Sequence, residues 1–138
     1  MGVFAVRIEV GNLQRYRFEP LDAWVDTGAF YSSVPRPLLE SLGVVPHIRE
    51  PFRLADGRVV EIEIGHAFIK VADRAEITLV LFGEPDSPVL LGAYSLEGLR
   101  LNVDPSARRL VPMPWLPLFL LDRGPGTGPR SPRAPRAA

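Results

Sequence analysis

One carboxylate stands where the sequence could support acid–base chemistry. Asp26 follows the strand-like run at residues 21–25 and opens the segment Asp26-Thr27-Gly28-Ala29, in which a glycine permits a sharp bend. A carboxylate in such a place can cap the turn by accepting a backbone N–H, or it can be held for catalysis. Because Asp, Thr and Gly meet by chance in many turns, the motif taken alone favours the capping role.

Other reactive groups receive less support from their spacing. The chain has no cysteine, so it offers no thiolate nucleophile or thiolate ligand. Ser32 and Ser33 lack a G-x-S-x-G context, and His47 and His66 stand apart from them in unrelated segments. The histidines also lack a ligand spacing such as H-x-x-x-H, so we expect no metal site and no cofactor.

Composition predicts one folded domain with a polar tail. Of the 138 residues 46% are hydrophobic and 23% charged, and fifteen prolines with twelve glycines favour strands and turns over long helices. Residues 123–138 carry four arginines and no acid, which leaves twelve basic and sixteen acidic residues over 1–122. This acidic balance argues against a nucleic-acid partner. We expect a domain over 1–122 and a disordered Pro/Gly/Arg-rich tail over 123–138.

Membrane and secretory signals are absent from the sequence pattern. The first ten residues lack the basic start and long apolar run of a secretory signal. The most apolar tract, RLVPMPWLPLFLL at 109–121, is interrupted by three prolines and is shorter than the roughly 20 apolar residues of a spanning helix. We therefore expect a cytoplasmic protein without a membrane partner.

Short strands joined by turns must position the Asp26 segment. Apolar and polar residues alternate over 4–10, as in a half-buried strand, and 36–44 resembles a short helix closed by Gly43. Asp56-Gly57 predicts a hairpin turn between apolar positions on either side, and a second turn is expected at 72–74. A strand ending at Leu91, a short helix at 93–99 and two further strands follow. The order predicts an all-β, mainly antiparallel fold with one or two short helices.

Taken together, these motifs resemble those of a known family. The segments VDTGA at 25–29, Val34-Pro35, LADGR at 54–58 and LLG at 90–92 occur in one order over about residues 3–112. In this order they resemble the retropepsin-like (clan AA) aspartic proteases, in particular the small bacterial single-domain members. The resemblance implies a closed acid-protease barrel.

The resemblance also implies roles for individual residues. In this family two aspartates share one proton and activate a water molecule, because two like charges so close together cannot both ionise cheaply. Asp26 would supply one catalytic carboxylate, and Thr27 would brace its loop by hydrogen-bonding across to its counterpart. Gly28 would permit the bend, Ala29 would keep the loop small, and Gly92 would give the backbone room beneath the loop.

The hairpin around Asp56 would correspond to the family's flap. It would close over an extended peptide and offer backbone hydrogen bonds. Retroviral flaps contain more glycine than this segment does, and its two charged residues could add a charge preference. The expected flap residues are Leu54, Ala55, Asp56, Gly57, Arg58 and Val59.

A single Asp-Thr-Gly motif has a consequence for assembly. Because a catalytic pair needs two aspartates, the second would come from another copy, and the resemblance implies a two-fold homodimer. The apolar segment 110–121 could pack across that interface. The expected activity is that of an aspartic endopeptidase whose partners are a second copy and an extended peptide substrate. The alternative is a non-catalytic peptide-binding or assembly module on the same fold.

Overall fold

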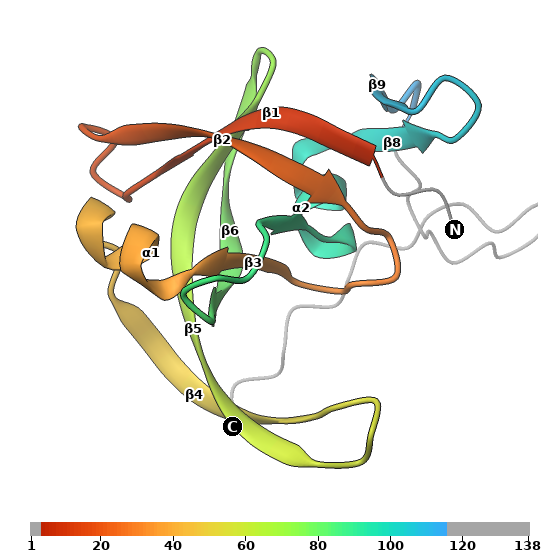
Figure 1. The fold of residues 1–138 in the computed structure, drawn as a ribbon. Helices are drawn as coiled ribbons and strands as arrows, with labels where there is room; N and C mark the ends of the chain where they lie inside the picture. The colour runs from red at the N-terminus through yellow and green to blue at the C-terminus, as the bar shows by residue number, and fades with distance from the viewer. Residues whose placement is uncertain (1–3, 116–138) are drawn as a thin grey trace, which may run out of the picture.

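The computed structural model describes residues 4–115, and the expected tail at 123–138 and most of segment 110–121 lie outside them. Two short helices accompany nine strands within this range (Figure 1), which confirms the prediction of a mainly β protein. The elements are β1 (Phe4–Gly11), β2 (Phe18–Val25), β3 (Ser32–Pro35), α1 (Arg36–Leu42), β4 (Pro46–Arg53), β5 (Val59–Val71), β6 (Arg74–Gly83), β7 (Leu90–Leu91), α2 (Ala93–Leu99), β8 (Leu101–Asp104) and β9 (Arg109–Pro112).

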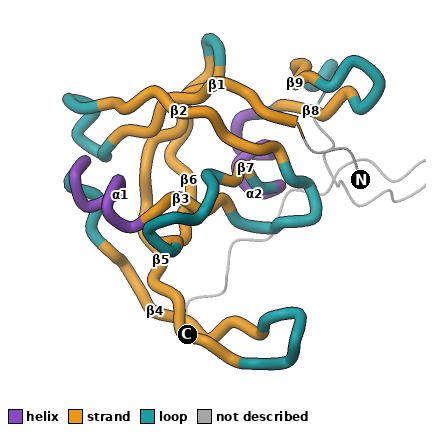
Figure 2. Tube along the Cα trace, in the orientation of Figure 1, coloured by secondary structure: helices purple, strands orange, loops and turns teal. Residues whose placement is uncertain are grey.

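Seven strands form one sheet in the order β1-β2-β7-β3-β6-β5-β4, and β8 and β9 form a separate pair. Strand β1 also pairs with β5, so the sheet curls back toward its first strand (Figure 2). Most pairings are antiparallel, as predicted, but β2–β7 and β3–β6 are parallel. The fold is consistent with the retropepsin-like architecture, while barrel closure and dimerisation stay predictions.

Local sequence explains where the elements begin and end. Helix α1 buries Leu39 and Leu42 and ends at Gly43, whose φ of 82° is left-handed and suits glycine. The hairpin between β4 and β5 turns at Gly57, whose φ is 91°. The sequence pattern predicts both turns, and the structure confirms them.

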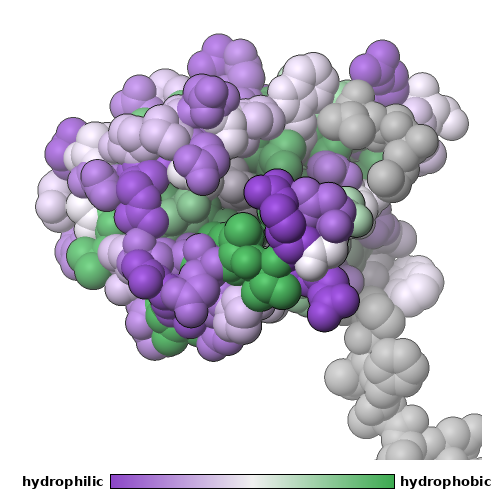
Figure 3. Space-filling model, turned by 60° about the horizontal axis from the view of Figure 1, so that its bottom comes forward, coloured by the Kyte–Doolittle hydropathy of each residue, from purple (hydrophilic) through white to green (hydrophobic). Residues whose placement is uncertain are grey.

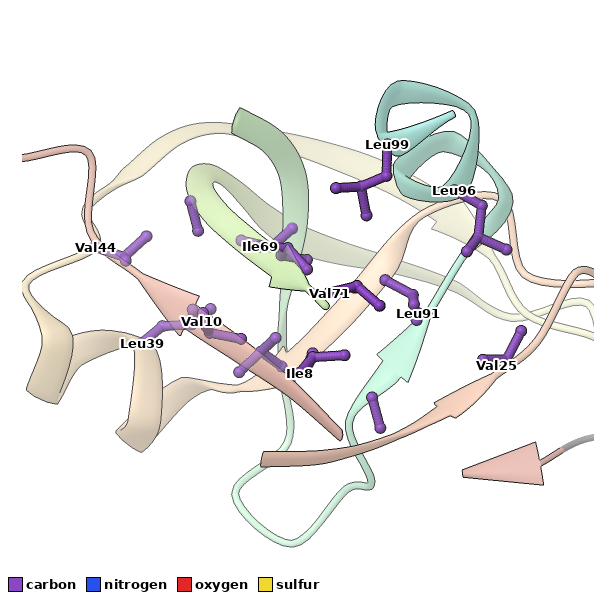
Figure 4. Packing of buried hydrophobic residues seen from close by; sticks show 14 of the residues in the cluster. Ile8, Val10, Val25, Leu39, Val44, Ile69, Val71, Leu91, Leu96 and Leu99 are labelled. Atoms are coloured by element: carbon purple, nitrogen blue, oxygen red, sulfur yellow. The ribbon is translucent and has the colours of Figure 1, made fainter. Parts of the chain in front are cut away.

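The hydrophobic core lies between the curled sheet and the two helices (Figure 4). Burying a Val, Leu or Ile side chain contributes about 1.5–3 kcal/mol, so the core fixes the strands firmly. Val25 and Leu91 are 1% and 0% exposed, and each immediately precedes a residue of the candidate site. Asp26 and Gly92 therefore leave the core from two anchored neighbours.

Candidate active site

Asp26 leaves the end of β2 in a tight, capped turn. Its N–H donates to the carbonyl of Leu91 at 3.1 Å, and its own carbonyl accepts the N–H of Ala29 at 3.1 Å. The carboxylate Oδ1 accepts the N–H of Gly28 at 2.9 Å. Within residues 4–115 this partly exposed carboxylate makes no ion pair and no other hydrogen bond, so Oδ2 is available to a ligand. The structure therefore contains the capping interaction, which orients the Asp26 carboxylate through Oδ1 and leaves Oδ2 available.

A third strand separates the two strands that the Asp26 loop connects. Strand β7 is parallel to β2, with Trp24 opposite Leu90, and antiparallel to β3, with Ser33 opposite Leu90. After β7 the chain bonds the loop again, because the N–H groups of residues 93 and 94 donate to the carbonyls of residues 29 and 30, both at 2.9 Å. The loop is thus held by backbone hydrogen bonds along its length.

Position 92 lies against this loop with space only for glycine. A Cβ at Gly92 would lie 2.6 Å from the carbonyl carbon of Tyr31, 2.7 Å from its oxygen and 2.9 Å from the carbonyl oxygen of Phe30. These contacts are with backbone atoms, which cannot swing aside as a side chain can. The φ of Gly92 is −93°, so the constraint is one of space and not of backbone conformation.

Three buried hydroxyl groups form a hydrogen-bonded set that holds the backbone at Gly92, next to the Asp26 loop. The sequence analysis did not predict this set. The Ser32 hydroxyl accepts the N–H of Gly92 at 3.0 Å and lies 2.6 Å from the Ser95 hydroxyl, which lies 2.8 Å from that of Thr78. They come from β3, α2 and β6 and are at most 5% exposed. The sequence offered no local signal, because the three residues lie in segments that also contain other polar side chains. We name this set the hydroxyl triplet.

The Asp56–Gly57 hairpin forms a defined turn. Leu54 donates its N–H to the carbonyl of Arg58 at 2.8 Å and accepts the N–H of Gly57 at 2.9 Å. Asp56 accepts the N–H of Arg58 at 3.0 Å and its guanidinium Nε at 2.7 Å. These hydrogen bonds, of which the one from the Arg58 backbone has the larger effect, hold the pKa of Asp56 below its ordinary value of 3.8. Ala55 and Val59 are exposed.

The structure brings the loop residues together but not the hairpin with them. Residues 26–29 form one turn that is hydrogen-bonded to residues 91 and 93 on either side of Gly92, whereas no hydrogen bond, ion pair or ring contact among the described residues joins 54–59 to this turn. In Figure 1 the hairpin turn and the β2–β3 loop extend toward the same side of the molecule. Figure 3 views the face that carries the hairpin, where apolar side chains lie beside strongly hydrophilic ones.

Aromatic rings connect the loop to the hairpin strands, a feature that sequence reasoning did not identify. Tyr31 contacts Phe30, Tyr94 and Phe52 of β4, with ring centroids 4.8, 5.9 and 6.3 Å apart. Phe30 is 61% exposed and Tyr94 is 42% exposed. These four side chains, here called the aromatic cluster, offer an apolar surface immediately after Asp26.

Thr27 is exposed and opens onto a shallow hollow of about 190 Å³. Its other lining residues come from α2, β8 and the chain after β9, among them Leu96, Leu101 and Met113. A larger hollow of about 680 Å³ lies elsewhere, between β1 and the end of β5, and includes no residue of the candidate site. Volume alone therefore does not locate the site.

The two histidines correct one interpretation of the sequence. They were placed in unrelated contexts, yet the rings of His47 and His66 lie 5.1 Å apart between centroids. The sheet brings together residues that no local spacing relates. Among residues 4–115 no group of three or more His, Cys, Asp or Glu side chains could hold a metal ion. No helix in the same range has the length and apolar character to cross a membrane.

Comparisons with known proteins bear on the fold. No family model and no curated protein matches the sequence. Among solved structures, the protease of simian foamy virus (mac) matches with a TM-score of 0.52 and 21% identity, over 68% of this chain and 92% of its own. A Legionella pneumophila protein of unknown function matches with a TM-score of 0.49 and 16% identity, over 75% of this chain and 92% of its own. The viral protease and this chain share a retropepsin-like fold.

Proposed function

We propose that this protein is an aspartic endopeptidase in which Asp26 from each of two copies forms the catalytic pair. The observation that carries the proposal is the Asp26 loop. One carboxylate oxygen of Asp26 accepts the Gly28 N–H and the other is available. Strand β7 is hydrogen-bonded to the loop, and Gly92 packs closely against its backbone. The fold shared with a viral protease supports the same function.

The chemistry follows from two carboxylates that share one proton. The ionised carboxylate takes a proton from a water molecule while the water oxygen attacks the peptide carbonyl carbon. The protonated carboxyl donates its proton to the carbonyl oxygen. The first carboxyl then donates the proton that it took from the water to the amide nitrogen as the C–N bond breaks, and the second carboxylate takes a proton back from the hydroxyl of the tetrahedral intermediate. A rigid loop favours this reaction because both carboxylates must keep their geometry throughout.

A homodimer follows from the count of motifs. The sequence contains one Asp-Thr-Gly, so the second carboxylate has to come from a second copy on a two-fold axis. Thr27 is exposed beside a shallow hollow of mixed polar and apolar lining, which supports a partner seated against this edge of the loop. The structure describes segment 110–121 as far as Trp115, which is 72% exposed. We propose this segment as a further contact between the two copies.

The substrate proposed is an extended, apolar-rich peptide. It would lie between the Asp26 loop and the β4–β5 hairpin, where main-chain groups can pair with it as an added strand. The aromatic cluster reaches from Phe30 to Phe52 and would favour hydrophobic side chains next to the scissile bond.

The test compares two matched substitutions on an unstructured apolar-rich polypeptide. Asp26→Asn removes the ionisable group at nearly constant shape and should abolish cleavage, while Asp22→Asn should leave it unchanged. Asp22 lies four residues earlier in β2, 73% exposed in a surface ion pair with Arg7, so it controls for charge. Cleavage that survives Asp26→Asn would remove Asp26 from the mechanism. Peptide binding by the wild type without cleavage would favour the non-catalytic alternative.

A further inference from the structure

The histidine pair lies where the pairing of β4 with β5 ends, away from the hairpin turn. His47 belongs to β4 and His66 to β5, and these are the only histidines in the chain. Neither imidazole makes a hydrogen bond or an ion pair with any part of the chain that the structure describes. Their ring nitrogens are therefore available to an outside ligand.

Two backbone features bring the rings together. The register of β4 against β5 shifts between Pro46 and Ile48, so His47 is the extra residue of a β-bulge. A bulge redirects the side chain that it carries. Gly65 lies opposite Pro46 and allows the backbone at Val45 to approach β5 closely. A Cβ at Gly65 would lie 3.0 Å from the carbonyl oxygen of Val45. The arrangement is built from the backbone and is not a chance meeting of long side chains.

The spacing fits two imidazoles that bind one ion. A zinc–nitrogen bond of about 2.0–2.1 Å puts each ring centre about 3.2 Å from the ion, and a tetrahedral angle then separates the two centres by about 5.2 Å. The observed separation is 5.1 Å, with the ring planes inclined at 56° and so not stacked face to face.

The surroundings leave room for the rest of a coordination shell. Both histidines line a hollow of about 340 Å³ together with Gln14 and residues 43–46. A water molecule occupies about 30 Å³ in the liquid, so an ion with two or three waters can be accommodated. The Gln14 side chain adds an amide oxygen at the wall of the same hollow.

We propose that His47 and His66 bind one divalent transition-metal ion of the class that prefers imidazole nitrogen, such as Cu²⁺ or Zn²⁺. The ion would join β4 to β5 near the start of β4 and so restrain the β4–β5 hairpin. The site is distinct from the proposed catalytic pair, and its existence does not depend on proteolytic activity.

The experiment uses untagged protein, because a polyhistidine tag would supply competing ligands. Zn²⁺ is titrated into the wild type, His47→Gln and His66→Gln by calorimetry, and Cu²⁺ binding is followed by electron paramagnetic resonance. We expect one ion per chain in the wild type, nitrogen hyperfine structure from copper, and an affinity loss of roughly tenfold or more in each variant. Asp26→Asn is the control and should bind zinc like the wild type.

Specific results would overturn the proposal. Absence of zinc binding, an unchanged affinity in both histidine variants, or one ion per two chains would each contradict a site formed by His47 and His66 of one copy. Circular dichroism without metal checks that each variant is folded. A second readout is amide hydrogen exchange, which Zn²⁺ should slow in β4 and β5 of the wild type but not of His47→Gln, and equal slowing in both would refute the link to the hairpin.

Discussion

Replacing Gly92 by alanine tests how the Asp26 loop is held. The added Cβ would meet the carbonyl carbon of Tyr31 at 2.6 Å and its oxygen at 2.7 Å, far inside normal contact. Because both partners are backbone atoms, β7 and the loop must move apart. The φ of −93° is ordinary for alanine, so any effect comes from this collision alone.

The magnitude follows from what the movement disrupts. Overpacking costs about 1–3 kcal/mol. The N–H groups of Ala93 and Tyr94 bond the loop at 2.9 Å on the other side of Gly92, and each such bond contributes about 0.5–1.5 kcal/mol. We expect Gly92→Ala to lower the free energy of unfolding by about 2–4 kcal/mol and to reduce cleavage at temperatures where the protein stays folded.

Gly98 provides the matched control within the same helix region. No atom lies within 4 Å of a Cβ built at Gly98, which belongs to α2. Gly98→Ala should therefore raise stability by about 0.5–1 kcal/mol, since alanine suits a helix better than glycine. Urea unfolding at one fixed protein concentration measures both variants. A loss below about 0.5 kcal/mol for Gly92→Ala, within the range of a neutral surface change, would refute the steric argument.

Further predictions concern the hydroxyl triplet, the hairpin turn and assembly. Ser95→Ala leaves the other two buried hydroxyls short of a partner and should lower the free energy of unfolding in urea by about 1–3 kcal/mol. Replacing the exposed Ser41 by alanine should change it by no more than about 0.5 kcal/mol. Equal effects of the two substitutions would contradict the role of the hydroxyl triplet. The pKa of Asp56 is depressed, so its contribution to the turn is present above pH 3.8 and is lost as the pH falls through the lower folded value. Carboxyl NMR should give a midpoint below 3.8 that rises in Arg58→Ala, and a wild-type midpoint at or above 3.8 would contradict the hydrogen bonds to Arg58. Light scattering should give twice the chain mass of 15.3 kDa, and full activity in a strictly monomeric sample would exclude a shared site.

Local patterns predicted most of the elements because they depend on neighbouring residues. The alternation over β1, the left-handed glycine after α1 and the turn at Gly57 each follow from a few consecutive side chains. Strand β3 was missed because four residues with two serines carry too little periodicity. The parallel pairing of β2 with β7 joins segments more than 60 residues apart, which local patterns cannot encode.

The site was only partly predictable for the same reason. Asp26 could be predicted as a candidate because its motif is contiguous in the sequence. The hydroxyl triplet joins residues 32, 78 and 95, and the histidine pair joins residues 47 and 66 through a bulge. Such contacts arise from register and strand order, which become visible only in three dimensions.

The most direct test of the central claim mixes two versions of the protein. Asp26→Asn subunits are added to a constant amount of wild type, time is allowed for subunits to exchange, and cleavage of a peptide substrate is measured. If each active site needs one Asp26 from each copy, random pairing lowers activity to about one half at equal concentrations and about one tenth at ninefold excess. Activity that stays constant across the mixture, although mixed dimers form, would contradict a catalytic pair shared between two chains.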